Sequence, residues 1–431
     1  MNDVNRWSRA GLAAALVVGL LPSVVACADD WPQWRGPGRD SVWHEQGIVR
    51  SFPAAGLKIA WRRRVGPGYS SPVVAGGRVY LTDSELARPK AKERIRCFDG
   101  TSGKPLWTCA YDVSYPDWAF TQGPGCGPTA TPIAEAGKVY ALGAMGDLCC
   151  CDARTGELVW RKRLGEDYRV KEFACRASPL IEGGLLIVYV GGEPAACLIA
   201  FEKDTGTEAW RALDEPMTNS SPIVVTAGGK RQLLVWTQSS LTSLDPATGK
   251  AYWRERLASD NNSSVATPVV EGNRLLLAGL MMRLDADRPG VSLVWPADYR
   301  HMVPTLSNTS TPMLRGDEVY SAKSSGELVC LDARTGRQLW QSDKVTDLKN
   351  GAGIHLTPNG DRVFLYTERG ELIVARLTAK GYDELGRTRL LEPTYPFGGR
   401  NVAWAPSSYA DRCVFARSDR ELVCASLAAK P

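Results

Sequence analysis

Residues 150–160 are CCDARTGELVW, and nearly the same pattern returns as CLDARTGRQLW at 330–340 and as SLDPATGKAYW at 243–253. In each copy an Asp starts a turn, a Thr-Gly pair completes it, and a Trp stands four residues after the Gly. An Asp that caps a turn and a Gly that takes a positive φ are typical of tight turns between strands. The stretch therefore predicts a β-hairpin whose second strand carries the Trp.

A second motif precedes each of these hairpins. SSPVVAGGRVYLTD at 70–83 recurs in related form at 129–143, 177–191, 220–236, 266–279 and 310–322. Pro is tolerated at the first position of a strand, and a Gly-Gly or Gly-Asn pair turns the chain into the next strand. The two motifs together predict four short strands per unit. Their spacing of roughly 42 to 60 residues is typical of a propeller or a solenoid.

The units count to eight once both ends of the chain are considered. A seventh unit has Leu385 in the Trp position, and an eighth ends before its fourth strand, whereas LKIAWRRRVG at 57–66 is a strand without a unit. We therefore predict an all-β, eight-bladed β-propeller of four-stranded antiparallel blades, with the ring closed by the N-terminal strand. The Trp row is predicted to be structural, as apolar spacers between blades. Its members are Trp61, Trp107, Trp160, Trp210, Trp253, Trp295 and Trp340.

The repeat resembles the quinoprotein-type, or PQQ-like, β-propeller repeat, whose motif is Ala-x-Asp-x-x-Thr-Gly-x-x-x-Trp. The resemblance runs from Leu57 to Leu427, and DDWPQWRGPGRD at 29–40 is similar to the start of many exported bacterial propellers of this type. It implies a fold more than an activity. The family includes dehydrogenases that bind pyrroloquinoline quinone (PQQ) with calcium, and it includes the non-enzymatic propeller lipoprotein of outer-membrane assembly.

The N-terminus predicts export. Arg6 and Arg9 precede an apolar run from Leu12 to Ala26, and small residues follow it, which is the layout of a secretory signal. A cut after Ala28 and a lipidated Cys27 both fit the sequence. We divide the chain into a signal peptide at 1–28, a Trp-rich N-terminal segment at 29–56 and a single propeller domain at 57–431. The expected location is the periplasm or cell envelope, with a lipid anchor at Cys27 as the open alternative.

Composition excludes several other classes of function. The net charge of +5 is dispersed along the chain, which argues against a nucleic-acid surface. After residue 28 no stretch is apolar enough to predict a transmembrane span in the mature chain. We expect a monomer.

The sequence predicts no metal site and leaves catalytic residues unknown. There are three His residues, at no zinc-like spacing, and no Cys-x-x-Cys-His motif for haem. No cofactor is predicted from the residues themselves. The resemblance implies PQQ with calcium under the alternative that the chain is a quinone-dependent dehydrogenase of alcohols or sugars, but no stretch matches that site.

The loops before the innermost strands are the candidate binding site. Eight such loops should converge on one axis and form a polar funnel for a small polar ligand or a peptide. The alternative is that their Asn, Ser and Thr side chains cap turns. Cys126 and Cys175 are expected near the channel in neighbouring blades, either bonded or as free thiols. The predicted funnel residues are Ser70, Cys126, Cys175, Arg176, Asn219, Asn262, Asn308, His355 and Trp404.

These features together predict an exported, non-enzymatic propeller that binds or scaffolds a protein or peptide partner in the envelope. Its mechanism would be β-augmentation or capture of extended segments by loops.

Overall fold

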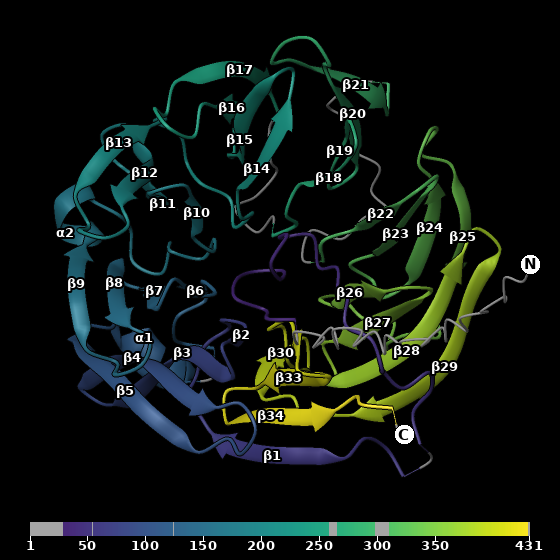
Figure 1. Cartoon of the computed structure of the whole chain (residues 1–431), viewed down its shortest axis with the longest axis horizontal. Coiled ribbons are helices and arrows are strands. Elements are labelled where there is room, and N and C mark those ends of the chain that lie inside the picture. The colour runs from purple at the N-terminus through teal and green to yellow at the C-terminus, as the bar shows by residue number, and fades with distance from the viewer. Residues whose placement is uncertain (1–28, 54, 124, 258–264, 298–309, 430–431) are drawn as a thin grey trace, which may run out of the picture.

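The computed structural model describes residues 29–53, 55–123, 125–257, 265–297 and 310–429. These residues form eight four-stranded antiparallel sheets arranged as blades around one axis (Figure 1). The predicted eight-bladed propeller is therefore confirmed. The predicted signal peptide, with Cys27, lies outside the described residues.

The first four blades follow chain order from the innermost strand outward: β2 (Val73–Ala75), β3 (Arg78–Ala87), β4 (Lys90–Asp99) and β5 (Pro105–Val113); β6 (Ile133–Glu135), β7 (Lys138–Leu142), β8 (Asp147–Asp152) and β9 (Leu158–Arg163); β10 (Leu180–Glu182), β11 (Leu185–Gly192), β12 (Ala196–Glu202) and β13 (Glu208–Ala212); β14 (Ile223–Ala227), β15 (Lys230–Trp236), β16 (Ser240–Leu244) and β17 (Ala251–Arg256).

Blades 5 to 7 follow in the same manner: β18 (Val269–Glu271), β19 (Arg274–Leu277), β20 (Leu280–Leu284) and β21 (Val291–Trp295); β22 (Met313–Arg315), β23 (Glu318–Ala322), β24 (Leu328–Asp332) and β25 (Gln338–Ser342); β26 (Ile354–Asn359), β27 (Arg362–Thr367), β28 (Glu371–Thr378) and β29 (Gly381–Arg389). Blade 8 combines β32 (Ser408–Ala410), β33 (Cys413–Arg417) and β34 (Glu421–Ser426) with β1 (Ile59–Arg64) as its outermost strand.

The ring is closed by the first strand of the chain, as predicted. β1 pairs antiparallel with β34, with Trp61 opposite Cys424 and Arg62 opposite Val423. The Arg62 guanidinium also forms an ion pair of 3.0 Å with Glu421. This closure pairs the third strand of the last blade and removes an open sheet edge.

Buried and half-buried tryptophans join one blade to the next. The Nε1 of Trp107 donates to the Ala153 carbonyl of blade 2 at 3.1 Å, and its ring lies against Gly156 in the same turn. Trp61, Trp160, Trp210, Trp295 and Trp340 also donate to a turn carbonyl in the following blade. Trp253 differs, because it donates to Gln232 Oε1 within its own blade.

The Ser and Thr residues before the innermost strands bind across blades around the channel. The backbone N–H of Ser71 donates to Thr131 Oγ1, that of Thr131 to Ser178 Oγ, and that of Ser178 to Ser221 Oγ, at 2.9–3.1 Å. Thr267 donates to Thr311 Oγ1 in the same way at 3.1 Å. These hydroxyls thus connect blades 1 to 4 and blades 5 to 6.

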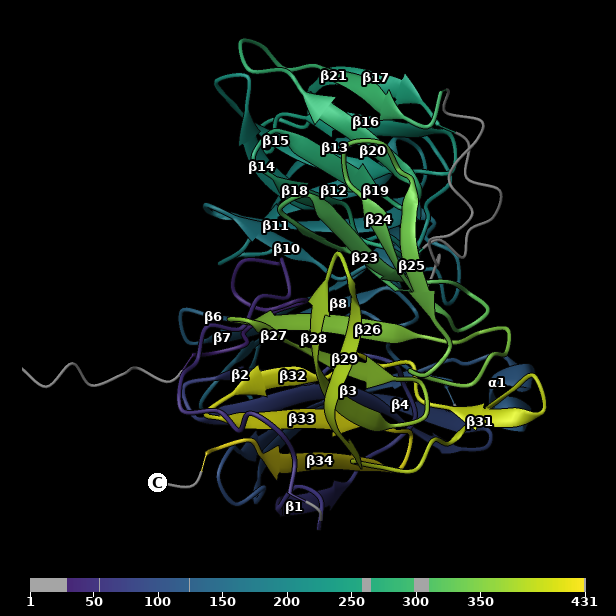
Figure 2. The same cartoon turned by 90° about the vertical axis from the view of Figure 1, so that its right-hand side faces the viewer.

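The two ends of the channel differ. One end carries the connections between blades, which include helices α1 (Asp117–Gln122) and α2 (Leu164–Tyr168) and the hairpin of β30 (Tyr395–Phe397) and β31 (Arg400–Val402). We call this end the loop end. The other end carries the turns of the innermost strands, such as Gly76–Gly77, and we call it the turn end. Figure 2 shows α1 and β31 on the side opposite the N-terminal segment.

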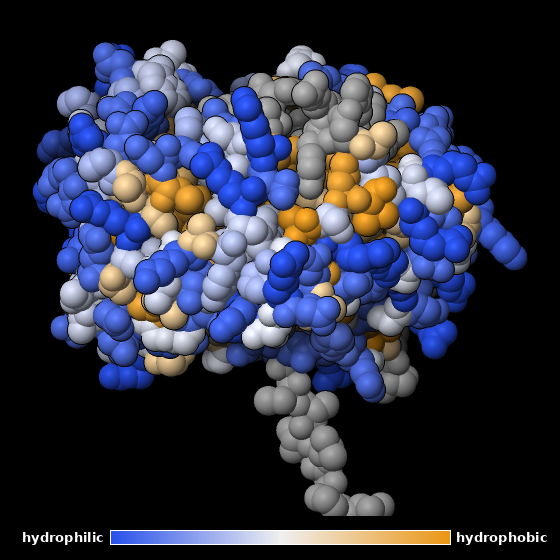
Figure 3. Space-filling model, turned by 90° about the horizontal axis from the view of Figure 1, so that it is seen from above, coloured by the Kyte–Doolittle hydropathy of each residue, from blue (hydrophilic) through white to orange (hydrophobic). Residues whose placement is uncertain are grey.

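The outer rim is mainly polar. Figure 3 views the molecule from the side of blades 4 and 5, where hydrophilic residues surround small separate apolar patches. The outer strands β17 and β21 alternate between exposed and more buried positions, as one-sided strands do. No helix among the described residues is long and apolar enough to cross a membrane.

Candidate functional site

The structure distributes the predicted funnel residues over different environments. Ser70 is fully buried and donates to the Thr82 carbonyl at 2.9 Å, so its hydroxyl is used inside blade 1. Cys126 and Cys175 are buried free thiols that belong to different apolar clusters. Burial raises the pKa of Cys126 to about 11. None of these three side chains is exposed in the channel mouth.

Other predicted funnel residues lie at the loop end. Arg176 is exposed and donates to the Phe173 carbonyl at 2.9 Å, and Asn219 is half-buried. The structure brings His355 and Trp404 together, with His355 Nε2 at 3.2 Å from the Trp404 carbonyl. Asn262 and Asn308 lie outside the described residues.

Aromatic rings cover part of the loop end around Trp404. The Trp404 ring lies 5.2 Å from Tyr395 and 4.9 Å from Phe397, both on the β30–β31 hairpin, and 6.1 Å from Tyr69. Gln122 of α1 donates to the Tyr395 hydroxyl at 3.0 Å. The hairpin is thereby tied to the connection between blades 1 and 2 that carries α1.

A second aromatic group at the loop end is open to solvent. Trp118 of α1 is 49% exposed, and its ring lies 4.8 Å from Phe173. Phe173 in turn lies 4.9 Å from the buried Tyr115. We call Trp118 and Phe173 the aromatic pair. An exposed tryptophan on a connecting loop is typical of a protein-binding surface.

Residues 31–43 of the N-terminal segment lie inside the ring, and the chain then passes outward beside blade 8 at Ile48 and blade 7 at Phe52, which the sequence did not predict. It runs from the turn end across the centre of the propeller (purple in Figure 1). Trp31 forms an antiparallel bridge with Val74, Pro32 accepts from Ala134 N–H at 2.8 Å, and Trp43 N–H donates to the Pro358 carbonyl at 2.9 Å. The segment also contacts blades 3, 4, 5 and 8 through side chains and backbone. Seven blades are therefore bridged by one short piece of chain.

Two arginines of this segment occupy the channel. Arg35 is 9% exposed, and it donates from Nε to Ser41 Oγ at 2.9 Å and from Nη2 to the Asp40 carbonyl at 3.2 Å. Arg39 is 7% exposed, and it donates to the Pro179 carbonyl at 2.8 Å and to the Pro222 carbonyl at 3.1 Å. Both take a left-handed backbone conformation, with φ of 63° and 54°.

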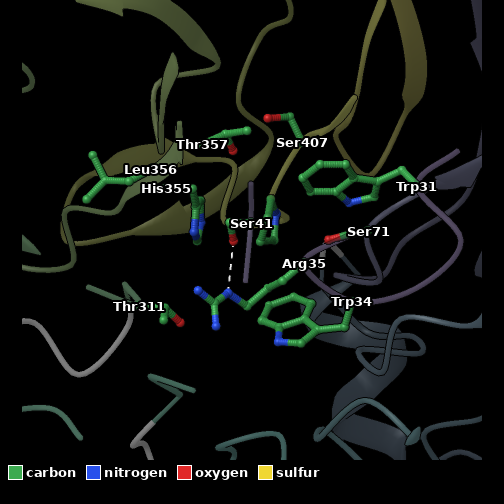
Figure 4. A pocket seen from close by; sticks show the side chains of 11 residues that line it. Trp31, Trp34, Arg35, Ser41, Ser71, Thr311, His355, Leu356, Thr357 and Ser407 are labelled. Atoms are coloured by element: carbon green, nitrogen blue, oxygen red, sulfur yellow. Dashed lines mark hydrogen bonds between the residues drawn. The ribbon is translucent and has the colours of Figure 1, made fainter. Parts of the chain in front are cut away.

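Cavities flank these arginines on both sides. A small cavity of about 30 Å³ lies between Arg35, Ser71 and His355 (Figure 4). Burial lowers the pKa of His355 to about 4, so its imidazole is neutral near pH 7. A larger cavity of about 260 Å³ lies between the N-terminal segment and the innermost strands of blades 3, 4 and 5.

A buried carboxyl lies beside the loop end in blade 1. Glu93 is fully buried and accepts from Tyr111 at 2.8 Å, from Tyr115 at 2.9 Å and from Ala144 N–H at 3.0 Å. Burial raises its pKa to about 7 against the opposing effect of these hydrogen bonds. Glu93 thereby fixes Tyr115 and the segment that leads to α1.

The described residues offer no metal centre. No group of three or more His, Cys, Asp or Glu side chains among them is placed to hold an ion. A quinone-calcium site needs carboxylate and amide oxygens around the cation. Within the described part of the chain, the carboxylates that line the channel cavities are Asp40 and Glu182, and Glu182 is already paired with Arg231, so this lining does not fit that group.

Sequence signals for the channel segment were present but incomplete. Three tryptophans, Trp31, Trp34 and Trp43, fall in a short stretch outside the repeat, and a soluble protein buries most large aromatic side chains. The sequence gives no partner for them, because their contacts are with blades far away in the chain.

Eight four-stranded blades with a Trp that packs on the next Thr-Gly turn define a propeller of the PQQ-like repeat class. The family model described as outer membrane protein assembly factor BamB matches residues 91–298 and 283–385, and the chain belongs to this family. The predicted resemblance is therefore confirmed.

One relative and two solved structures illustrate this similarity. BamB of Burkholderia pseudomallei is 25% identical over 238 residues, which cover 52% of this chain and 58% of that protein. The chain thus spans less than two thirds of that relative's length. The structure of BamB from Moraxella catarrhalis aligns with a TM-score of 0.58 at 17% identity, over 86% of this chain and 99% of that one. Quinohemoprotein alcohol dehydrogenase from Comamonas testosteroni aligns with a TM-score of 0.65 at 16% identity, over 93% and 81%. At these identities the two structures show the fold alone.

Proposed function

We propose that this chain is an exported propeller that binds protein partners in the cell envelope and has no catalytic role. Membership of a family named for outer-membrane protein assembly supports a binding role, and the protein partner is an extended segment captured by loops. The small polar ligand of the sequence prediction remains a second kind of occupant for the channel.

The observation that carries this proposal is the difference between the two channel ends. The turn end is partly covered by the chain's own N-terminal segment, whereas the loop end presents the aromatic pair of Trp118 and Phe173 beside the exposed Arg176. Tryptophan and arginine are the residues most enriched in binding hot spots. The loop end is therefore the proposed docking surface.

Site-specific photo-crosslinking tests the docking surface. A photoreactive amino acid replaces Trp118 in the full-length chain, and the matched control carries it at Leu106, which is 42% exposed on the outer strand of blade 1. We expect a discrete protein adduct in envelope fractions from position 118 only. The Arg176→Ala substitution should reduce the yield of this adduct. Equal adducts from both positions, or none from position 118, would contradict the proposal.

Export and chain layout belong to the same proposal. We infer a signal peptide at 1–28, a mature chain that begins with the Trp-rich segment 29–56, and a monomeric propeller at 57–431. Cell fractionation followed by mass spectrometry of the mature N-terminus distinguishes cleavage after Ala28 from a lipidated Cys27. Light scattering of the purified chain tests the monomer. A cytoplasmic chain that retains residues 1–28 would overturn the export proposal.

The quinone-dependent dehydrogenase is tested separately. The described residues around the channel do not provide the acidic cluster that a calcium-bound quinone requires. We therefore expect the purified chain with PQQ and calcium to show no dye-linked oxidation of alcohols or sugars above that of the Arg35→Gln variant. Tight quinone binding with turnover would replace the binding proposal with the enzymatic one.

A further inference from the structure

The two arginines in the channel form no ion-pair contact among the described residues, although the charge of Asp40 acts on Arg35 from a longer distance. Among the described residues no carboxylate lies within 4.0 Å of either guanidinium, and their partners are carbonyl, amide and hydroxyl oxygens. Burial lowers the pKa of Arg35 to about 10 and that of Arg39 to about 9, so both remain charged near pH 7. Burying unpaired charge is costly, and an anion placed beside them would relieve that cost.

The larger cavity gives access to this charge. Its volume of about 260 Å³ is lined by Arg35 and Arg39 on one side. The Arg39 Nε has no hydrogen-bond partner among the described residues, although the side chain is more than nine-tenths buried. A donor left unpaired in a buried position costs free energy unless a ligand or a water accepts from it.

The opposite wall of the cavity is apolar. Half-buried side chains from three innermost strands line it, including Ile181 of β10, Val225 of β14 and Val269 of β18. Arg231 also borders the cavity, but it is already paired with Glu182 at 2.7 Å. Asp40 is the remaining carboxylate of the lining. A second negative charge on the ligand would meet Asp40 and Glu182, which favours a monoanion.

We propose that this cavity binds a monocarboxylate with an apolar body, with the carboxylate on Arg39 and Arg35 and the body against the valines and Ile181. A guanidinium matches a carboxylate in geometry and charge, and the apolar wall supplies the area that a bare anion lacks. The source of such a group is a fatty acid or the C-terminus of an apolar peptide. This site lies in the channel and does not depend on the loop-end docking surface.

Matched ligand pairs test the chemistry on the purified mature chain by calorimetry. Octanoate is compared with octanol, and N-acetyl-leucine with N-acetyl-leucinamide, because each pair differs in charge and shares its apolar body. We expect each carboxylate to bind at least about tenfold tighter than its neutral partner. Tighter binding of octanoate indicates a fatty acid, and tighter binding of N-acetyl-leucine indicates a peptide terminus. Acetate and chloride are included to detect an adventitious ion only.

Two substitutions test whether octanoate binds in this cavity. Arg39→Gln removes the charge, and Val225→Asp leaves both arginines in place but adds a carboxylate to the apolar wall. Each should weaken octanoate binding at least about tenfold. The matched controls are Arg163→Gln, whose side chain is 59% exposed on the outer strand of blade 2, and Val159→Asp on the same strand, where Val159 is 49% exposed. Both should bind octanoate as the unsubstituted chain does.

Four results would overturn the proposal. Neutral ligands that bind as well as carboxylates would show an apolar hollow without anion recognition. Acetate or chloride that matches octanoate would show an adventitious ion only. Octanoate affinity that is unchanged in a folded Val225→Asp variant would show that the ligand does not bind in this cavity. The absence of binding by any carboxylate at millimolar concentration would show that the site does not exist. Arg39 also holds two carbonyls, so Val225→Asp decides the outcome where Arg39→Gln unfolds.

Discussion

Glu93 is a buried carboxyl whose raised pKa makes the stability of the protein depend on pH. It has no cationic partner within ion-pair distance among the described residues, and three hydrogen-bond donors satisfy it. Asp147 of blade 2, which is paired with Arg161 at 2.7 Å, raises the pKa of Glu93 further. Desolvation has the largest effect, and it raises the pKa of Glu93 from 4.5 to about 7.

This pKa predicts that the protein loses stability as pH rises from about 5 to 8. Between 4.5 and about 7 the folded state binds a proton that the unfolded state releases, so the free energy of unfolding falls with increasing pH. The loss attributable to Glu93 is about 3 kcal/mol. Glu93→Gln should remove this part of the pH dependence in urea unfolding, whereas Glu157→Gln on the surface should not. Parallel pH curves for the unsubstituted chain and Glu93→Gln would contradict it.

Individual positions in the repeat were predictable where their neighbours lie in the same blade. The slot that holds Cys150 pairs with Trp160 on one strand and Tyr140 on the other, and these rings lie 6.2 Å apart. A small residue fits between them, which explains why Cys, Ala and Ser share this slot. The sequence did not predict that Cys109 packs against the apolar cluster of Cys151, because that contact crosses from blade 1 to blade 2.

At the scale of elements, the lock between blades depends on one glycine per turn. A Cβ on Gly156 would lie 2.6 Å from the Trp107 ring, and the equivalent glycines Gly103, Gly206 and Gly249 face Trp61, Trp160 and Trp210 in the same way. The sequence identified the Trp and the turn but not that they meet across blades. Blade 5 has no Thr-Gly pair in the turn that would face Trp253 of blade 4. Trp253 instead donates to Gln232 inside its own blade.

We expect Gly156→Ala to destabilise the chain more than Gly137→Ala. Both glycines have a positive φ, of 77° and 76°, so both substitutions cost about 1 kcal/mol in backbone strain. Gly137 has no atom within 4 Å of the added Cβ, whereas Gly156 meets the Trp107 ring. Overpacking should therefore add about 1–3 kcal/mol for Gly156→Ala alone. Equal losses in urea unfolding would show that the Trp does not lock the blades.

The N-terminal segment is the element that the sequence placed least well. It was predicted as a separate Trp-rich segment, but its position inside the ring could not be inferred from periodicity, because it contributes isolated bridges rather than a ladder. Trp43 is 1% exposed and packs against Phe364 of blade 7 and Tyr409 of blade 8. Such contacts exist only after the ring has closed.

At the scale of the whole molecule, the first and last strands of the propeller meet in blade 8. β1 completes the sheet of β32, β33 and β34, and Val49 N–H donates to the Leu427 carbonyl at 2.8 Å beside it. The sequence predicted this closure, because the strand at 57–66 belongs to no repeat and the eighth repeat ends before its fourth strand. The stability of the propeller should therefore depend on the presence of β1 and much less on whether β1 comes before or after the other strands in the chain.

A circular permutant tests this conclusion. The permutant begins at Gly66 and carries residues 29–65 after Leu427, joined by a flexible linker of about ten residues, which spans up to ~33 Å. We expect cooperative unfolding with a Tm within about 5 °C of the original chain, because the added loop costs on the order of 1 kcal/mol.

A chain of residues 66–431 lacks both β1 and the channel segment. It should aggregate through the open edge of β34. A chain that begins at Leu57 keeps β1 and separates the two effects: it should stay soluble, with a lower Tm because the pocket of Trp43 is empty. A chain of residues 66–431 that unfolds at the same temperature as the original would show that ring closure does not stabilise this propeller.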